Sequence, residues 1–290
     1  MAEQFFGWES LREPKTALLC EGGGQRTMYG VGALQCFFDR RVTFPYYIGV
    51  SAAAANLASH LAGHRDRCER FYTEYVNRKE YMGLACLLKT GSFIDLNYIF
   101  DVITNHEDCI DYDTLCAVED EICIVVTNAL TGQAEYLGNR SFDERKCTAL
   151  MASSALPVVC KPVEIAGMPY FDGGVADSIP VERALADGCE RVVAILSRPA
   201  GFQKQPEKGH WLYERILRKY PEIVKALSMR HERYIASLKL LEQLEEEGRA
   251  MIIRPRESMS INTLTRRPIG LLRQVGRIGY QDAEAALLRG

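Results

Sequence analysis

Residues 49–53, with the sequence GVSAA, place a serine between an apolar segment and an alanine-rich one. From Gly49 onward the pattern matches the nucleophile elbow G-x-S-x-G, except that Ala53 replaces the second glycine. In such a strand-to-helix turn, small neighbours let the Ser51 hydroxyl stand clear of the sheet. The free N–H groups of the following helix favour negative charge beside it. The alternative is that Ser51 only caps that helix.

A run of glycines follows the first apolar segment: Gly22, Gly23 and Gly24, with Arg26 close behind. Glycine lets consecutive backbone N–H groups turn toward one point, where they could hold a phosphate or the oxyanion of a tetrahedral intermediate. The phosphate interpretation is weaker, because the lysine and hydroxyl of a P-loop are missing. A dinucleotide fingerprint would need glycine where Thr27 stands. A plain tight turn between strand and helix stays open as the alternative.

A third motif, Asp172-Gly173-Gly174, ends another apolar segment. A carboxylate at the end of a strand can point into a site, and the glycines allow other backbone to approach it closely. A serine hydroxyl is a poor nucleophile until a base accepts its proton. Asp172 could accept that proton directly, without a histidine, if burial adjusts its pKa. An ordinary Asp-Gly turn is the alternative for this motif alone.

In this order the motifs resemble those of the patatin-like phospholipase family, specifically its bacterial cytosolic branch: G-G-G-x-[R/K]-G, G-x-S-x-G and D-G-[G/A]. The resemblance continues through residues 152–157 and into 280–283, so that it covers most of the chain. It implies a serine acyl hydrolase with Ser51 as nucleophile and Asp172 as the dyad base, without cofactor or metal. It also implies supporting roles for Gly22, Gly23, Gly24 and Arg26 (oxyanion hole), Gly49 and Ala53 (elbow), and Gly173 and Gly174 (aspartate motif).

The sequence departs from the family pattern at Thr27 and at Ala53, each standing in place of a glycine. The first change predicts an oxyanion loop that bends differently, and the second is milder because alanine is nearly as small. A conventional α/β-hydrolase would need a histidine after its acid. Only His210 and His231 follow Asp172, both in a charged segment where we interpret them as solvated surface residues. A dyad is therefore the favoured architecture.

Short apolar segments alternate with amphipathic ones, which predicts a layered α/β fold. The resemblance implies a three-layer patatin-like fold with a central mixed sheet. We expect a single domain over residues 1–290, with 12–200 as the catalytic core and 201–290 as a helical C-terminal flank. The expected strands are 16–20, 46–50, 121–127, 134–137, 163–165, 169–171, 191–196 and 251–253. The expected helices are 28–40, 52–61, 65–77, 96–104, 141–152 behind a capping box of Ser141 and Glu144, one between Pro180 and Gly188, 211–247 and 271–288.

The composition is that of an ordinary globular enzyme, and the formal net charge of −3 argues against a nucleic-acid partner. None of the ten cysteines forms a Cys-x-x-Cys pair, so we expect buried free thiols in a reducing cytosol. No secretory signal or spanning segment is visible, and the acidic patch at 106–113 lacks a metal-binding spacing. The expected location is cytoplasmic, with peripheral membrane contact as an extension.

The substrate implied by the resemblance is a fatty-acyl lipid ester. Residues 254–277 carry six arginines against one acid, with Leu271, Leu272 and Val275 interleaved, which suggests contact with an anionic membrane surface. The alternative is that these arginines pair with acids near 243–247. Two other functions stay open: a soluble esterase or thioesterase for short acyl groups, and a non-catalytic relative that binds lipid or a partner through 211–247. The arginines are Arg254, Arg256, Arg266, Arg267, Arg273 and Arg277.

Overall fold

The computed structural model describes residues 8, 11–207, 209–259, 261 and 268–289, and it contains one mixed sheet of eight strands. The strand order is β5-β6-β3-β2-β1-β7-β8, with β4 paired to β3 beside this path. Five neighbouring strands run parallel, in the sheet order β3, β2, β1, β7 and β8. The strands β4, β5 and β6 add antiparallel pairs. The strands are β1 (Thr16–Cys20), β2 (Tyr46–Val50), β3 (Glu121–Asn128), β4 (Ala134–Leu137), β5 (Val163–Ile165), β6 (Met168–Asp172), β7 (Arg191–Ile195) and β8 (Ala250–Ile253).

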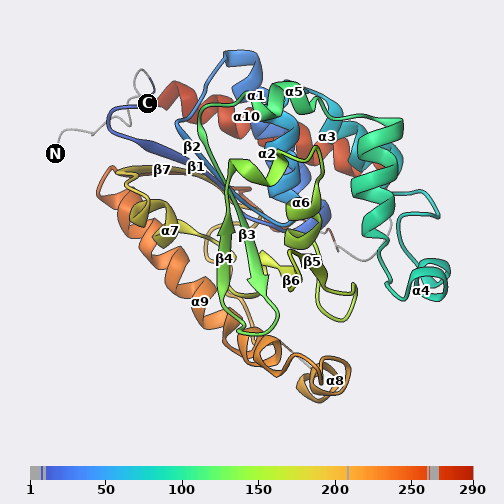
Figure 1. The fold of residues 1–290 in the computed structure, drawn as a ribbon. Helices are drawn as coiled ribbons and strands as arrows, with labels where there is room; N and C mark the ends of the chain where they lie inside the picture. Colours follow the sequence, from blue (N-terminus) through green and yellow to red (C-terminus); the bar gives the residue numbers. More distant parts are fainter. Residues whose placement is uncertain (1–7, 9–10, 208, 260, 262–267, 290) are drawn as a thin grey trace.

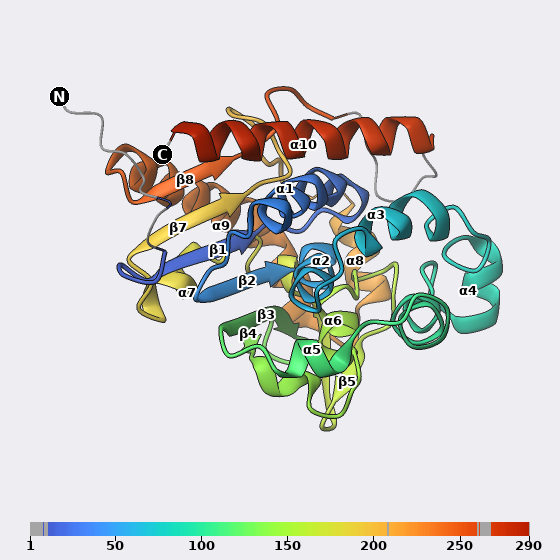
Figure 2. The same cartoon turned by 90° about the horizontal axis from the view of Figure 1, so that it is seen from above.

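Helices cover both faces of the sheet, because alternate side chains of its buried strands point into two separate cores. In β1, Leu18 packs with α1 (Met28–Arg40), α2 (Ala52–Leu61) and α10 (Ile269–Arg289). Its neighbour Leu19 packs with α7 (Val181–Ala186) and the later turns of α9 (Pro221–Glu246). Figure 1 shows α7 and α9 on one side of the sheet and α1, α2 and α10 on the other, an arrangement that Figure 2 repeats from above. The expected three-layer α/β fold is confirmed.

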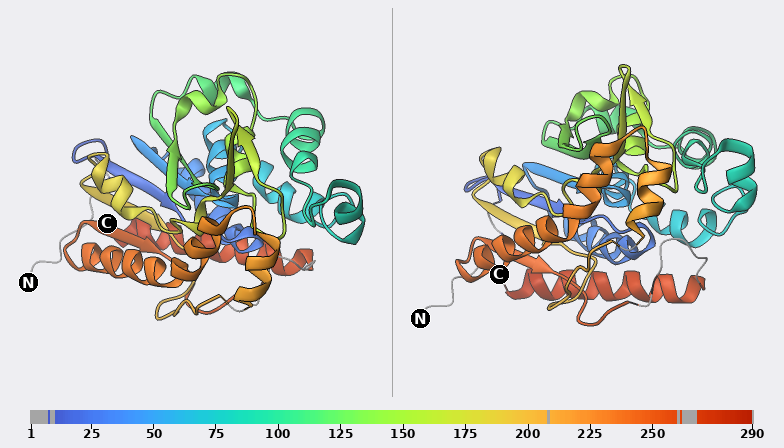
Figure 3. Two further views of the ribbon diagram at one scale, coloured as in Figure 1. Left: turned by 60° about the horizontal axis from the view of Figure 1, so that its bottom comes forward. Right: turned by 90° about the horizontal axis from the view of Figure 1, so that it is seen from below.

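The last helix, α10, lies along α1 at very short range, because glycines stand at the crossing. A Cβ atom added at Gly32 would lie 1.8 Å from the carbonyl oxygen of Gly276, and one added at Gly279 would lie 1.9 Å from that of Tyr29. The Tyr29 hydroxyl also donates to Asp282 at 2.8 Å. In Figure 3 this red helix runs as one rod along the edge of the molecule. The chain's last described residues are therefore an integral part of the layer on that face.

Part of the 254–277 segment, considered above for a membrane surface, lies in the core or in ion pairs, while Arg256 and Arg277 are exposed. Leu272 and Val275 are buried against α1 and its neighbours. Arg254 pairs with Glu242 at 2.8 Å, next to the acidic region that the alternative named. Of the remaining arginines, Arg266 and Arg267 lie outside the described residues.

Two expected helices are corrected by the structure. The capping box of Ser141 and Glu144 does not form: residues Asn139–Phe142 make a 3₁₀ turn (η4), and α6 begins only at Thr148 and ends at Ser153. The reason is tertiary, since Phe142 is buried and the Asn139 side chain accepts from the Ile122 N–H at 2.8 Å, tying this segment to the start of β3.

The expected helix over 211–247 is two helices, α8 (His210–Ile216) and α9. The break falls at Tyr220, whose backbone leaves the helical region before Pro221, the first residue of α9. The expected helix 65–77 is confirmed as helical, but it is α3 (Arg67–Arg70) followed by the π-helix η2 (Phe71–Tyr75), and the expected helix 96–104 is the π-helix η3 (Tyr98–Glu107). Sequence patterns missed two short helices, α4 (Leu84–Thr90) and α5 (Tyr112–Cys116).

All ten cysteines are free, but the expectation that they are buried fails at Cys109 and Cys116, which are exposed. Within the described ranges, no helix is long and apolar enough to cross a membrane. The same part of the chain holds no group of three metal-ligating side chains. In the acidic patch, Asp108 instead pairs with Arg70 at 2.8 Å, and Asp111 caps α5 by accepting from the Thr114 N–H.

Candidate active site

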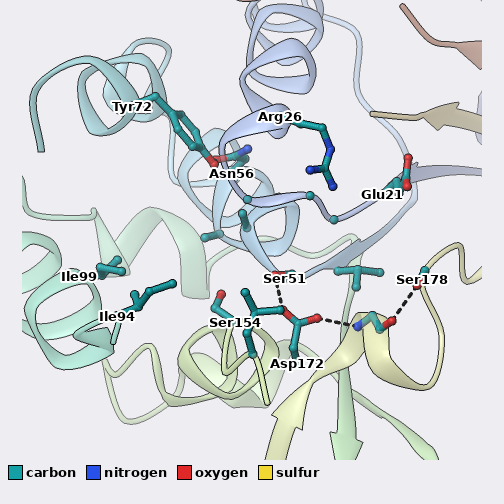
Figure 4. A pocket seen from close by; sticks show the side chains of 18 of the residues that line it. Glu21, Arg26, Ser51, Asn56, Tyr72, Ile94, Ile99, Ser154, Asp172 and Ser178 are labelled. Carbon is teal, nitrogen blue, oxygen red and sulfur yellow. Dashed lines mark hydrogen bonds between the residues drawn. The ribbon is translucent and has the colours of Figure 1, made fainter. Parts of the chain in front are cut away.

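One edge of β3 brings the serine and aspartate motifs together. Strand β4 occupies the other edge of β3 from Ile124 to Thr127, so β2 and β6 share the remaining edge, end to end. The last residue of β2, Val50, is opposite Val125, and the last residue of β6, Asp172, is opposite Val126. Because β2 and β6 run in opposite directions, their carboxyl ends meet there. The residue after Val50 is Ser51, which therefore faces Asp172 (Figure 4).

Ser51 adopts the strained backbone of a nucleophile elbow, with φ 56° and ψ −132°. It stands before α2 without capping it by its side chain, so the helix-cap interpretation fails. Gly49 is required, because a Cβ atom there would lie 2.8 Å from the Cα of Ala54 and from a methyl of Leu57. Ala53 is buried in the core, which explains why alanine is accepted at this position.

A buried serine that the sequence analysis did not single out holds the elbow in place. Ser153, at the end of α6, is 0% exposed and accepts from the Ser51 N–H at 2.8 Å. Its own hydroxyl donates to the Val125 carbonyl at 2.6 Å, which anchors the elbow to β3. The only signal in the sequence was its place in the 152–157 segment that resembles the family.

Asp172 is 2% exposed and both of its carboxylate oxygens are engaged. Ser51 Oγ donates to Oδ2 at 2.5 Å, and the Gly174 N–H donates to Oδ1 at 2.8 Å. Burial raises the pKa of Asp172, while the Ser51 hydrogen bond, the positive charge of Arg230 and the Gly174 N–H oppose the rise. Gly173 allows this packing, because a Cβ atom there would lie 2.1 Å from the Val125 carbonyl oxygen. The aspartate is thus more than an Asp-Gly turn: it is a buried carboxylate that accepts a hydrogen bond from the serine.

The glycine loop passes directly over Ser51. A Cβ atom added at Gly22 would lie 3.1 Å from the Ser51 Cβ, and Gly24 has a positive φ of 55° that favours glycine. Thr27, the departure from the family pattern, is buried; its hydroxyl donates to the Gly24 carbonyl at 2.7 Å and lies 2.7 Å from the Tyr72 hydroxyl. The threonine therefore ties the loop to the opposite wall of the site.

Ser51, Asp172 and the glycine loop line one cavity of about 440 Å³, which is apolar at one end and charged at the other. Figure 4 shows Ile94 and Ile99 on one side of Ser51 and Glu21 on the other, with Arg26 above. No histidine is among the described residues that line this cavity. The apolar end is formed by Phe71, Tyr72, Tyr81, Ile94, Leu96, Ile99, Phe100 and Leu156, and the charged end by Glu21, Arg26, Arg198, Lys204, Glu207 and Arg230.

For neither of the two histidines after Asp172 is the expected solvated surface position confirmed. His231 is not a solvated surface residue, because its side chain is only 21% exposed and its Nδ1 is buried without a hydrogen-bond partner among the described residues. It stands next to Arg230 on α9 but does not line the cavity. The side chain of His210 is outside the described set.

Comparisons with known proteins agree with the arrangement of these motifs. A family model described as patatin-like phospholipase matches residues 18–185, and one described as a domain of unknown function (DUF6363) matches residues 220–289. VipD from Legionella pneumophila aligns over 94% of this chain and 66% of its own, with a TM-score of 0.51 and 13% identity, a likeness of fold.

Curated relatives are similar over part of their length. The uncharacterised protein YjjU of Escherichia coli K12 is 28% identical over 67% of this chain and 55% of that protein. An uncharacterised NTE family protein of Mycobacterium bovis, Mb1092c, is 22% identical over 63% of this chain and 49% of that protein. The chain therefore spans about half the length of these relatives.

Proposed function

The chain belongs to the patatin-like phospholipase family, and from that premise we propose that it is a serine acyl hydrolase that cleaves a fatty-acyl lipid ester with a Ser51–Asp172 dyad. The family is consistent with lipid hydrolysis as the general activity. The observation that carries the specific proposal is the 2.5 Å hydrogen bond from Ser51 Oγ to the buried Asp172, in a cavity whose described lining contains no histidine.

In the acylation step, Ser51 Oγ attacks the ester carbonyl carbon while its proton passes to Asp172 Oδ2, to which it is already bonded. The carbonyl oxygen gains the negative charge, and backbone N–H groups of Gly23 and Gly24 stabilise it. When the tetrahedral intermediate collapses, the ester C–O bond breaks and Asp172 returns the proton to the leaving alcohol. The product left on the protein is an acyl ester of Ser51.

In the deacylation step, the same carboxylate takes a proton from water, which attacks the acyl carbonyl carbon. Collapse of the second intermediate returns the proton to Ser51 Oγ and releases the fatty acid. A base that works near neutral pH is favoured by a pKa above that of an ordinary carboxyl, and burial moves the pKa of Asp172 in that direction. The strained elbow holds the hydroxyl in one orientation for both steps.

The apolar end of the cavity supports a fatty-acyl chain over a short acyl group. It is lined by aromatic and branched side chains from η2, η3 and the segment between α4 and η3. Such a wall stabilises methylene groups by about 0.8 kcal/mol each when they leave water. A short-chain esterase or thioesterase would leave most of this surface unused. A non-catalytic relative would not need the strained backbone at Ser51.

The test is covalent labelling by a fluorophosphonate together with hydrolysis of p-nitrophenyl esters of increasing chain length. We expect labelling in the wild-type protein and in His231→Ala, and its loss in Ser51→Ala and Asp172→Asn, with kcat/KM rising with chain length. A folded wild-type protein that is neither labelled nor active would refute the hydrolase and favour the lipid- or partner-binding alternative. Activity restricted to the shortest esters would favour the short-acyl esterase.

A further inference from the structure

The hydroxyl of Thr27 joins three parts of the candidate site. It donates to the Gly24 carbonyl of the glycine loop at 2.7 Å and lies 2.7 Å from the Tyr72 hydroxyl on η2. The Nδ2 of Asn56, on the helix α2 that follows Ser51, donates to the same oxygen at 3.3 Å. The side chains of Thr27, Tyr72 and Asn56 are all buried. Thr27 stands where the family pattern has glycine, so a chain with that glycine could not form this junction.

The number of protons gives these hydrogen bonds a direction. A carbonyl oxygen only accepts, so the single proton of the Thr27 hydroxyl lies toward Gly24. In the 2.7 Å pair the donor must then be Tyr72, whose other acceptor, the Oδ1 of Asn56, is more distant at 3.5 Å. A chain of donors therefore runs from the phenol of Tyr72 through the threonine to the backbone of the glycine loop.

The glycine loop needs support from outside because it has few side chains of its own. Gly22, Gly23 and Gly24 carry no Cβ atom, so the backbone torsions there are only weakly restrained. The Gly24 carbonyl belongs to the planar peptide that links Gly24 to Gln25, so a hydrogen bond to it fixes the ψ angle of Gly24. The proposed oxyanion donors are N–H groups of the same loop. A shift of the loop by about 1 Å would move them away from the developing charge.

The Tyr72 side chain also belongs to the apolar end of the cavity. It lines the cavity beside Phe71, which packs edge-on against its ring with the ring centroids 5.2 Å apart. Figure 4 shows the side chain reaching from η2 toward Asn56, with the hydroxyl at the end nearest α2. A fatty-acyl chain in the apolar end would pack against this ring and restrict its motion. One side chain thus links the place of the acyl chain to the hydrogen bonds that hold the glycine loop.

We propose that Tyr72 is a positioning residue that makes kcat depend on acyl-chain length: a long chain packs against its ring, and Tyr72 then aligns the oxyanion loop through Thr27. Binding energy from a non-reacting part of a substrate raises kcat only when it is used to align the reacting groups. Here the acyl chain supplies that energy, and the hydrogen bond between Tyr72 and Thr27 carries it to the loop. A short acyl group leaves the ring free to move, so the loop is aligned less often. This inference rests on the proposed hydrolase, because it assigns a residue to that enzyme's chain-length specificity.

The first experiment separates kcat from KM along a series of p-nitrophenyl esters from butyrate to decanoate. In the wild-type protein we expect kcat to rise with chain length. Tyr72→Phe keeps the ring and loses the hydroxyl, so we expect kcat to fall about tenfold for the decanoate and less than about twofold for the butyrate. KM should still decrease with chain length, because the apolar wall is intact. Thr27→Val should give the same result from the other side of the hydrogen bond, and Thr27→Ser, which keeps a hydroxyl, should restore the wild-type pattern.

Tyr75→Phe is the matched control. Tyr75 lies on the same π-helix, is 7% exposed and is not among the described residues that line the cavity, so the loss of its hydroxyl should leave the kcat profile unchanged. A deficit in Tyr72→Phe that is equal at every chain length overturns the proposal, because the hydroxyl would then only support the fold. A change confined to KM, a wild-type profile in Thr27→Val, or the same deficit in Tyr75→Phe overturns it as well.

The second experiment does not depend on turnover. Hydrogen exchange of the backbone amides of residues 22–27 is followed by mass spectrometry, without decanoic acid and at a concentration that calorimetry shows to be saturating. We expect decanoic acid to slow exchange in the wild-type protein and in Tyr75→Phe, and to leave it unchanged in Tyr72→Phe and Thr27→Val.

The two experiments together distinguish failure of the proposed hydrolase from failure of the link through Tyr72. If no ester is hydrolysed while decanoic acid slows exchange in the expected variants, the hydrolase fails and the link between the apolar end and the loop stands. If the esters are hydrolysed while exchange in the wild-type protein does not respond, the hydrolase stands and the link fails. Absence of decanoic acid binding would remove the acyl site on which the link depends, and so overturns the proposal.

Discussion

Replacing Ser153 by alanine tests whether a residue outside the dyad holds the nucleophile in its strained conformation. Ser153 is fully buried and its hydroxyl links the Ser51 N–H to the Val125 carbonyl at 2.8 and 2.6 Å. The Ser153→Ala variant loses both hydrogen bonds and leaves a donor and an acceptor without this partner. Each such loss costs about 1–3 kcal/mol, so we expect the free energy of unfolding to fall by about 2–6 kcal/mol.

The same substitution should slow catalysis as well as weaken the fold. A positive φ at a serine costs about 1–3 kcal/mol and persists only when its surroundings enforce it. Without Ser153 the elbow relaxes and the Ser51 hydroxyl moves away from Asp172. A displacement near 1 Å is enough to reduce the rate by about 10²-fold. We therefore expect kcat for a p-nitrophenyl ester, and the rate of fluorophosphonate labelling, to fall by about 10- to 100-fold.

The measurements are urea unfolding and kcat on the same preparations, with Ser228→Ala as control. Ser228 lies on α9, and its hydroxyl donates within the helix to the Lys225 carbonyl at 2.7 Å. The reasoning is refuted if Ser153→Ala loses stability but keeps kcat within threefold of wild type, because Ser153 would then support the sheet and not the nucleophile.

Three further outcomes follow from the same contacts. Asp172→Asn removes the proposed base and should lower kcat by about 10²–10⁴-fold. Burial raises the folded-state pKa of Asp172, so the stability linked to its proton is present at acid pH and is lost as pH rises through that pKa. Urea unfolding at neutral pH should therefore find Asp172→Asn at least as stable as the wild-type protein. A clear loss of stability at neutral pH would contradict the burial argument. Arg230→Met removes a charge that lowers the same pKa, so the acid limb of the kcat/KM–pH profile should move to higher pH, and a shift to lower pH would show that Arg230 acts otherwise. Gly32→Ala places a Cβ atom 1.8 Å from the Gly276 carbonyl oxygen. Limited proteolysis should therefore cleave α10 faster, and the free energy of unfolding should fall by at least about 1–3 kcal/mol. An unchanged rate of proteolysis would mean that α10 shifts without loosening.

The front half of the fold was predictable from sequence because local patterns and tertiary packing agree there. The expected bounds of β1, α1, β2 and α2 match the structure, and the glycines that mark their junctions are the ones that close packing requires. The Ser51 elbow and the Asp172 motif could be named because, in this order with the glycine loop, they resemble the motifs of the family, although each alone could be a helix cap or a turn. Their meeting point could not be predicted, since it depends on which edge of β3 the strand β6 joins.

Other parts of the site left no local signal. Ser141 and Glu144 have the spacing of a capping box, yet burial of Phe142 outweighed that weak preference. Arg198 and Arg230 are separated by more than thirty residues and look like ordinary surface charges until α9 packs onto the sheet. Ser153 looks like one small residue among several, because its importance lies in two backbone groups that the sequence does not show.

Because β2 and β6 meet end to end on one edge of β3, the contact between Ser51 and Asp172 depends on strand register. Val125 and Val126 are consecutive, so a slip of β6 by a single residue along β3 would turn Asp172 to the opposite face of the sheet. Parallel and antiparallel portions of the sheet must therefore be joined in one register before the serine meets its base. In a refolding experiment, the rate at which fluorophosphonate reactivity appears would therefore measure the rate at which the two portions of the sheet join in register.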